Sequence, residues 1–182
     1  MTEKEKMIAG ELYRPGDPEL VEGRARNQRF MAAYNATSVN DGDVRQTLLT
    51  EWFGKVGKDC ALRAPLYTDY GSNIFLGDDV FFNYACVLLD VCPIYIGDMT
   101  QIGPMTQILT ADHPRDAETR DKGLEFGKPI HIGRNVWIGG GALILPGVTV
   151  GDDAIIGAGA VVTRNVRAGA TLVGNPARKV AG

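Results

Sequence analysis

From residue 132 onward, a branched aliphatic residue recurs every six positions. These residues are Ile132, Ile138, Ile144, Val150, Ile156 and Val162. Four places after each comes a small or branched residue: Val136, Ala142, Val148, Ala154, Ala160 and Val166. Six-residue units of this kind are typical of a parallel β-helix, in which each unit forms a short strand and a turn, and the stacked coils bury a continuous apolar column. The pattern predicts an all-β solenoid and by itself leaves the handedness open.

The same period occurs earlier in another phase. Its apolar positions are Tyr70, Leu76, Phe82 and Leu88, and the positions four places on include Cys86 and Cys92. This placement predicts that both cysteines fill small interior positions and are not catalytic thiols. Two residues are inserted around Pro93, after which the repeat resumes at Ile96, Ile102 and Ile108.

The repeat then fails over about residues 109–131. The next expected apolar positions hold Pro114, Arg120 and Phe126. We predict an excursion loop that leaves the stack at Pro114, and loops of this length often carry function. His113 lies at the point of departure, as either an incidental surface histidine or a general base whose unperturbed pKa is near working pH. His131 occupies an outward-facing slot and is predicted to be a surface residue.

The first 58 residues follow the helical period instead. Thr2 and Glu5 fit a capping box that opens a short helix. Asp17 before a proline fits the N-cap of a helix that runs to about residue 35. A third helix is expected to begin near Asp43, with three apolar residues on one face: Val44, Leu48 and Trp52. We therefore expect a helical cap over residues 1–58 and a solenoid domain over residues 59–182.

Composition narrows the possible functions. The chain has 182 residues and a formal net charge of -3. It therefore lacks the excess of Lys and Arg that is typical of nucleic-acid-binding proteins. Its three cysteines show no CxxC spacing, so they indicate neither a disulfide framework nor a zinc site. The charged start MTEKEKMIAG has no signal-peptide core and favours the cytoplasm. A long uncharged run, residues 136–151, is rich in Gly and Pro and too short to cross a membrane comfortably.

Several segments carry a family resemblance. EKMIAGELY, YGSNIFLG, LLDVCPIYIGD, TADHP, GKPIHIGRNVWIGG and GNPAR together resemble the maltose/galactoside O-acetyltransferases, which are hexapeptide-repeat acyltransferases, and among them the maltose O-acetyltransferases most. The resemblance covers nearly the whole chain. It implies a left-handed parallel β-helix assembled as a homotrimer, with active sites between adjacent subunits. It also implies direct acetyl transfer from acetyl-CoA to a sugar hydroxyl, with His113 as the general base.

The resemblance also assigns residues to the acceptor side of the site. Glu125, at the end of the excursion, could orient or polarise His113 on the logic by which a third group holds a base. The expected sugar-binding residues are Asp17, Ser72, Asn83, Asp90 and Trp137. Asp17 could equally be only a helix N-cap, and Asn83 only a turn residue. Trp137 occupies an outward slot, where an indole can stack on a ligand or on a trimer partner.

The expected acetyl-CoA contacts are Gly140, Ala158, Thr163, Arg164 and Arg178. Small residues let the pantetheine arm approach the backbone, and arginines pair with phosphates, although both arginines could simply be solvated surface charges. The glycine run around Gly140 could also offer N–H groups to an oxyanion, although for Gly139 a role in turning the coil is preferred. Two departures from the family pattern occur: Arg164-Asn165 replaces the usual Lys-Asp, and Lys179 replaces an apolar residue.

Other functions of this fold are weighed against this hypothesis. A carbonic-anhydrase-type zinc site needs three histidine ligands, and the chain has two histidines, so we expect no metal. Serine acetyltransferases carry a much longer helical N-terminal domain. A galactoside-type or other small acceptor remains open. A non-catalytic solenoid scaffold also remains open, and it predicts an uninterrupted repeat, unlike this one.

Overall fold

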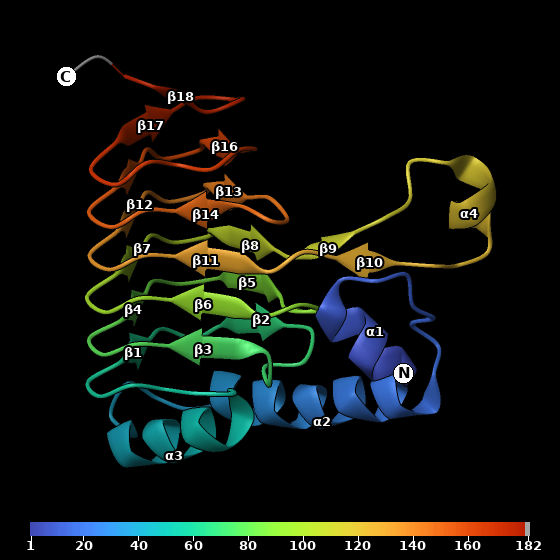
Figure 1. Cartoon of the computed structure of the whole chain (residues 1–182). Coiled ribbons are helices and arrows are strands. Elements are labelled where there is room, and N and C mark those ends of the chain that lie inside the picture. Colours follow the sequence, from blue (N-terminus) through green and yellow to red (C-terminus); the bar gives the residue numbers. More distant parts are fainter. Residues whose placement is uncertain (181–182) are drawn as a thin grey trace.

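The fold, seen in a computed structural model that describes residues 1–180, is a three-sided parallel β-solenoid preceded by helices (Figure 1). The helices are α1 (Glu3–Ala9), α2 (Pro18–Asn35), α3 (Gly42–Trp52) and α4 (Ala117–Asp121). One side, the β1 face, contains β1 (Ala61–Leu62), β4 (Phe81–Phe82), β7 (Gln101–Ile102), β12 (Trp137–Ile138), β15 (Ile155–Ile156), β17 (Thr171–Val173) and β18 (Arg178–Lys179).

The other two sides have the same construction. The β2 face contains β2 (Leu66–Thr68), β5 (Cys86–Leu89), β8 (Gln107–Leu109), β13 (Leu143–Ile144) and β16 (Val161–Val162). The β3 face contains β3 (Ile74–Leu76), β6 (Ile94–Ile96), β11 (Ile130–Ile132) and β14 (Thr149–Val150). A separate two-stranded ribbon is formed by β9 (Ala111–Asp112) and β10 (Phe126–Gly127).

One coil is three six-residue units long. Ile132 pairs in parallel with Val150, and the difference between their numbers, 150 − 132, is 18. Ile138 pairs in the same way with Ile156. The aliphatic positions predicted from residue 132 to 162 are all 3% exposed or less, because they point into the stack. The predicted solenoid and its apolar column are therefore confirmed.

The earlier phase is only partly confirmed. Leu76, Phe82 and Leu88 belong to the main core, and Cys86 is buried there as predicted. Tyr70 and Cys92 are also buried, so the interior position predicted for Cys92 is confirmed. Both residues pack in a second cluster beside the N-terminal segment, however, and their placement in the column is wrong. The column position is taken by Thr68, which is paired with Leu88, because two residues are inserted between Thr68 and Leu76 as well as around Pro93.

Both short insertions and the long excursion occur at one corner of the stack, where the β2 face turns into the β3 face. We call this the β2/β3 corner. It contains residues 69–73, 90–93 and 110–129, which connect β2 to β3, β5 to β6, and β8 to β11. Ile96 pairs directly with Ile132, so the stack is continuous beneath the excursion. The corner thus accepts extra residues without a break in the core.

The excursion begins earlier than the proline predicted. Ala111 and Asp112 already pair antiparallel with Gly127 and Phe126, so the chain leaves the stack after Leu109 and not at Pro114. The predicted excursion of about residues 109–131 otherwise matches. It is an antiparallel ribbon that ends in α4 and projects from the stack above α1 (Figure 1). The residue before His113 is therefore fixed by the ribbon and not by a coil.

The helical segment folds as its caps predict. Thr2 and Glu5 form a capping box, and Asp17 Oδ1 accepts the N–H of Glu19 at the start of α2. In α3 the expected packing role of Val44 is wrong, since this side chain is 54% exposed while Leu49 and Trp52 are buried. Tyr34, Leu49 and Trp52 pack into the same core as the first coil. The last two residues of the predicted solenoid domain lie outside the described part of the chain.

Candidate active site

His113 lies on the ribbon, and its backbone is held by local contacts. The His113 N–H donates to Asp112 Oδ1 at 2.8 Å, and its carbonyl accepts from Arg115 Nη1 at 2.8 Å. Arg115 also binds both carboxylate oxygens of Asp112, at 2.7 and 3.0 Å. Partial burial opposes ionisation of Asp112, but these hydrogen bonds prevail and hold its pKa below the ordinary value. The exposed His113 side chain therefore stands on an ordered backbone.

Glu125, the second residue predicted on this loop, lies on the returning arm of the ribbon. Its Oε2 accepts a hydrogen bond from the hydroxyl of Tyr13 at 2.9 Å. Phe126 is paired with Asp112, so continuing the ribbon's register by one residue sets Glu125 opposite His113. Glu125 and His113, which were predicted to act together as a base and its orienting residue, are thus neighbours across the ribbon.

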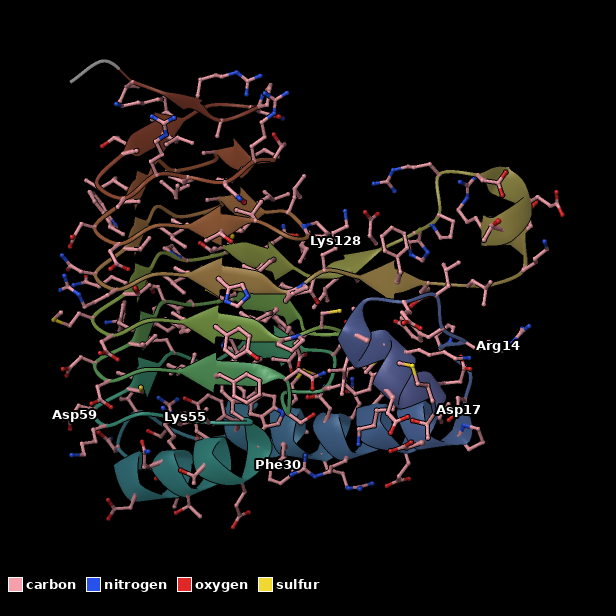
Figure 2. All side chains as sticks on the ribbon, viewed as in Figure 1. Arg14, Asp17, Phe30, Lys55, Asp59 and Lys128 are labelled. Atoms are coloured by element: carbon pink, nitrogen blue, oxygen red, sulfur yellow. The ribbon has the colours of Figure 1, made fainter. Side chains whose placement is uncertain are left out.

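Ser72 and Asp17 lie beside the N-terminal helices. Ser72 lines a cavity of about 270 Å³ between α1, α2 and residues 70–73, together with Lys4, Glu19 and Arg26. Asp17 is the half-buried N-cap of α2, so its structural role is realised. Figure 2 shows Asp17 at the end of α2 near α1, on the same side of the molecule as the root of the ribbon, which Lys128 marks.

Asp90 is fully buried at the β2/β3 corner, with 0% of its surface exposed. Its carboxylate accepts the N–H groups of Asp69 (3.0 Å), Tyr70 (2.8 Å) and Asn73 (3.2 Å). Burial raises its pKa to about 7 despite these hydrogen bonds. The residue that interrupts the apolar run VLLDV therefore binds the backbone of the turn that carries Ser72. Its carboxylate has no exposed surface to offer a ligand.

Four of the remaining predicted residues come together in a groove at another corner of the stack, where the β1 face turns into the β2 face. Asn83, Trp137, Gly140 and Ala158 line this cavity of about 430 Å³. Trp137 is 59% exposed, as its outward slot predicted. Asn83 Oδ1 also accepts the N–H of Tyr84 at 2.8 Å, so the same residue stabilises the turn and lines the groove. We call this cavity the β1/β2 groove.

The glycine run at this groove contains two different kinds of position. A Cβ on Gly139 would lie 2.5 Å from the backbone nitrogen of Ala158, so this glycine is required for the coils to stack. A Cβ on Gly140 would lie 3.1 Å from its nearest neighbour, Pro104. The N–H groups of Gly139 and Gly141 donate to carbonyls of adjacent coils, whereas that of Gly140 makes no hydrogen bond within residues 1–180.

The other residues predicted to contact the cofactor lie further along the stack. Thr163 and Arg164 follow β16, and Arg178 lies in β18, which Figure 1 shows at the C-terminal end of the solenoid. All three are exposed. Neither arginine forms an ion pair within residues 1–180. Arg178 Nη1 donates to the carbonyl of Ala177 at 2.9 Å, so its remaining N–H groups and the guanidinium of Arg164 have no carboxylate partner within residues 1–180.

Two residues near the ribbon carried no predicted role. Tyr13 is 1% exposed, and its place in the segment EKMIAGELY gave no hint of a contact with Glu125, 112 positions away. The pKa of Asp69 is raised to about 6, because burial and, to a smaller extent, the charge of Glu125 raise it more than Arg24 lowers it. A lone Asp after a buried strand was the only signal for Asp69, and such residues are common in turns.

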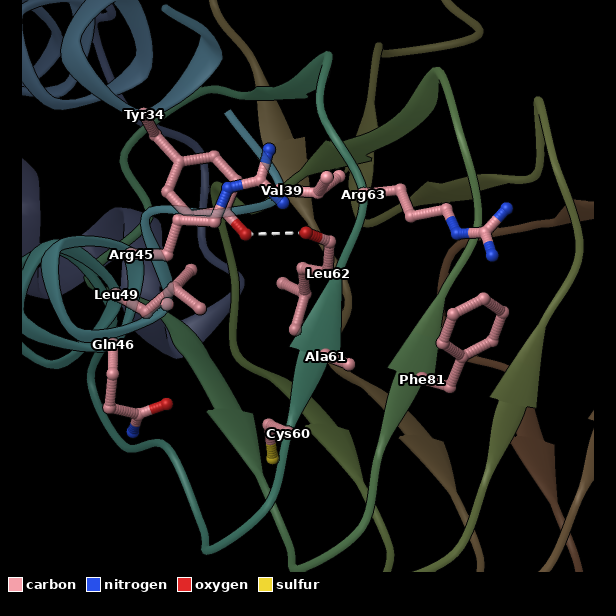
Figure 3. Close-up of a pocket in the computed structure, with 11 residues that line it drawn as sticks. Tyr34, Val39, Arg45, Gln46, Leu49, Cys60, Ala61, Leu62, Arg63 and Phe81 are labelled. Carbon is pink, nitrogen blue, oxygen red and sulfur yellow. Dashed lines mark hydrogen bonds between the residues drawn. The ribbon is translucent and has the colours of Figure 1, made fainter. Parts of the chain in front are cut away.

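A further cavity of about 320 Å³ lies between α3 and the first coil. Tyr34, Arg45, Arg63 and Phe81 line it, and the Tyr34 hydroxyl donates to the carbonyl of Leu62 (Figure 3). The predicted site residues lie elsewhere. Within residues 1–180 the His, Cys, Asp and Glu side chains form no cluster of three or more that could hold a metal ion. Over the same residues, no helix has the length and apolar character needed to cross a membrane.

Comparison with known proteins identifies both parts of the chain. Residues 6–57 match the maltose acetyltransferase hexapeptide capping motif, and residues 129–164 match the bacterial transferase hexapeptide (six repeats). Nodulation protein L of Rhizobium meliloti (strain 1021) is 49% identical over 97% of both chains. A maltose O-acetyltransferase from Clostridium difficile 630 superimposes with a TM-score of 0.97 at 45% identity, covering 99% of this chain and 96% of its own. A galactoside acetyltransferase solved in complex with coenzyme A superimposes with a TM-score of 0.95 at 34% identity, covering 100% and 90%.

Proposed function

The chain belongs to the maltose and galactoside O-acetyltransferase family of acetyl-CoA-dependent enzymes, and from this premise we propose that it acetylates a sugar hydroxyl with His113 as the general base. The acceptor is of the maltose or glucose type, with a galactoside as the alternative. A single observation carries the proposal. His113, one of only two histidines, lies exposed on a ribbon that leaves an otherwise regular stack, and hydrogen bonds hold its backbone.

The chemistry needs a base because a sugar hydroxyl is a poor nucleophile at neutral pH. In our proposal His113 accepts the hydroxyl proton as the oxygen attacks the thioester carbonyl, and the thiolate of CoA leaves without an acetyl-enzyme. The developing oxyanion requires a fixed donor. We assign this role to the Gly140 N–H, because it has no partner within residues 1–180 and Gly140 lines the β1/β2 groove.

Acetyl-CoA is proposed to lie along the later coils. Ala158 and Gly140 line the groove with small side chains, which lets the pantetheine arm approach the backbone. Arg164 and Arg178 are exposed and without ion pairs within residues 1–180, and guanidinium groups bind phosphates bidentately. Thr163 adds a hydroxyl beside Arg164. We place the reaction in the cytoplasm, which also suits the free thiols of Cys60, Cys86 and Cys92.

On the acceptor side, Ser72, Asp17, Asn83 and Trp137 are proposed to face the sugar. The first two lie on the ribbon's side of the molecule, and the last two line the β1/β2 groove. Asp90 is proposed to act indirectly, by holding the turn of Ser72. Glu125 is proposed to orient the imidazole of His113 from across the ribbon.

The two halves of this site lie at different corners of one chain, which supports a homotrimer with active sites between subunits. In our proposal the ribbon of one copy meets the β1/β2 groove of the next. The β2 face, which lies between the two corners, bears outward aliphatic side chains: Val87, Leu89, Leu109, Leu143 and Val161. Burial of such a row between copies is favourable.

The test is release of CoA from acetyl-CoA with glucose, maltose or a thiogalactoside as acceptor. We expect His113→Ala to lower kcat by about 10²- to 10⁴-fold, the usual contribution of a general base. His131→Ala, which removes the other histidine from the outer side of the β3 face, serves as the matched control and keeps wild-type activity. Full activity of His113→Ala would overturn the assigned base, and no turnover with any of the three sugars would overturn the sugar acceptor.

A further inference from the structure

The ribbon that carries His113 is attached along its free edge to the segment between α1 and α2. The Tyr13 N–H donates to the carbonyl of Glu125 at 2.9 Å, and the Glu125 N–H donates to the carbonyl of Tyr13 at 3.1 Å. This reciprocal antiparallel bridge makes Tyr13 a one-residue third strand beside β10. The returning arm of the ribbon thus has a backbone partner on both edges.

The contact continues through the side chains. The Tyr13 hydroxyl donates to Glu125 Oε2 at 2.9 Å. The Tyr13 ring is 1% exposed and packs in the second core cluster with Met7, Leu20 and Tyr70. Burial, followed by the hydrogen bond with Glu125, raises the pKa of Tyr13 far above its ordinary value. The hydroxyl therefore keeps its proton and can only donate to the carboxylate.

Glu125 is in turn placed toward His113. Opposite residues of an antiparallel pair project on the same side. Extending the register of β9 and β10 by one residue, beyond Asp112 and Phe126, therefore sets the side chains of His113 and Glu125 on one side of the ribbon. The second carboxylate oxygen, Oε1, accepts no hydrogen bond within residues 1–180. A carboxylate fixed at one oxygen and free at the other can accept an imidazole N–H and stabilise the imidazolium that forms when the base takes a proton.

We propose that Tyr13 is a positioning residue for the transfer reaction, which fixes Glu125 and, through it, the orientation of the His113 imidazole. The inference rests on the proposed role of His113 as the base. Tyr13 itself is buried and reaches the reaction only through Glu125. The N-terminal segment, far from the ribbon in sequence, thereby takes part in catalysis.

The test is Tyr13→Phe, which removes the hydroxyl and leaves the ring and the backbone bridge. Because the ribbon stays in place, we expect kcat to fall about tenfold or more while KM for acetyl-CoA and for the acceptor changes by less than about threefold. Tyr34→Phe is the matched control. It removes a buried hydroxyl that donates to the carbonyl of Leu62 at 2.5 Å, away from the ribbon, and its kcat stays at the wild-type value.

A double-mutant comparison shows whether Tyr13 acts through Glu125. If it does, Tyr13→Phe combined with Glu125→Gln loses no more activity than Glu125→Gln alone. Losses that multiply, or a Tyr13→Phe enzyme with wild-type kcat, overturn the inference. Thermal unfolding monitors folding. Glu125→Asp, which keeps the charge but withdraws it from the hydroxyl, gives a second measurement, and wild-type kcat in this variant also overturns it.

The two proposals fail in different ways. If His113→Ala remains fully active, the base is misassigned and the role of Tyr13 falls with it. If His113→Ala is inactive while Tyr13→Phe turns over at the wild-type rate, the base stands and only the positioning role is lost.

Discussion

At the scale of single residues, Asp90 organises the corner at which the ribbon emerges. Three backbone N–H groups of residues 69–73 converge on its carboxylate, and the Asn73 side chain donates to its carbonyl at 2.7 Å. Buried N–H groups without partners are costly. One side chain therefore replaces the ladder hydrogen bonds that the two inserted residues cannot make.

Asp90→Asn tests this role. The amide keeps the shape of the carboxyl group but turns one acceptor into a donor that faces a backbone N–H. We expect the free energy of unfolding to fall by about 1–3 kcal/mol, the cost of an unsatisfied buried group, as measured by urea denaturation at pH 5. At this pH the substitution removes no buried charge, because burial raises the pKa of Asp90 to about 7. Asp59→Asn, at an exposed turn, is the control. Equal stability of the two variants would contradict the proposed role.

The same corner predicts a pH dependence of stability. Burial raises the pKa of Asp90 to about 7 and that of Asp69 to about 6, both above the ordinary value near 3.8. The folded state therefore binds more protons than the unfolded state, and the stabilisation is complete below about pH 4 and is lost as pH rises to about 7. Asp69→Asn should flatten the part of this slope below pH 6. Unfolding midpoints recorded from pH 4 to 8 check it, and a steeper slope in the variant would be inconsistent.

At the scale of elements, the coils stack so closely that some turns admit only glycine. A Cβ on Gly139, in the turn after β12, would meet the Ala158 backbone at 2.5 Å in the turn after β15. Each turn continues a strand that is paired with its neighbours, so neither can move without disturbing those pairs. Asn135 and Asp153 have positive φ at equivalent turns one coil apart, which fits the preference of Asn and Asp for this conformation. The clearance at glycines such as Gly139 thus limits how closely the coils can stack.

Gly139→Ala is accordingly expected to lower the free energy of unfolding by about 1–3 kcal/mol, the usual cost of overpacking. Gly16→Ala, where a Cβ meets nothing within 4 Å, should be close to neutral. Chemical denaturation of both variants decides the matter. If the Gly139→Ala protein is as stable as the Gly16→Ala protein, the neighbouring coils can shift to accept the added Cβ, and the prediction is wrong.

At the scale of the whole molecule, the ribbon and the β1/β2 groove flank the β2 face on two different corners. The proposed trimer brings them together by burying that face. Leu143 is one of its outward residues, and a charge there would be desolvated at the interface.

Leu143→Glu is therefore predicted to give monomers with little acetyltransferase activity, as measured by light scattering on a sizing column and by CoA release. Thr149→Glu adds the same charge to the exposed β3 face and leaves both assembly and activity intact. An active Leu143→Glu monomer would show that one chain contains a complete site.

The sequence alone determined the solenoid, its period and the break that carries His113. These follow from local pattern, because each six-residue unit repeats the same burial and any failure of the repeat is visible at once. It also located the caps of α1 and α2, which depend on residues a few positions apart. It misplaced Tyr70, Cys92 and Val44, because inserted residues shift the phase and a short helix offers several apolar faces.

Only the tertiary structure decided which site residues meet. Asp90 became a buried support, Asn83 and Trp137 joined one groove, and Tyr13 was brought to Glu125 across 112 positions of sequence. The contact between Tyr13 and Glu125 depends on how the segment between α1 and α2 packs against the ribbon. No periodicity of the sequence encodes this packing. Repetition specified the scaffold, whereas the residues that depart from it acquired their partners only when the chain was folded.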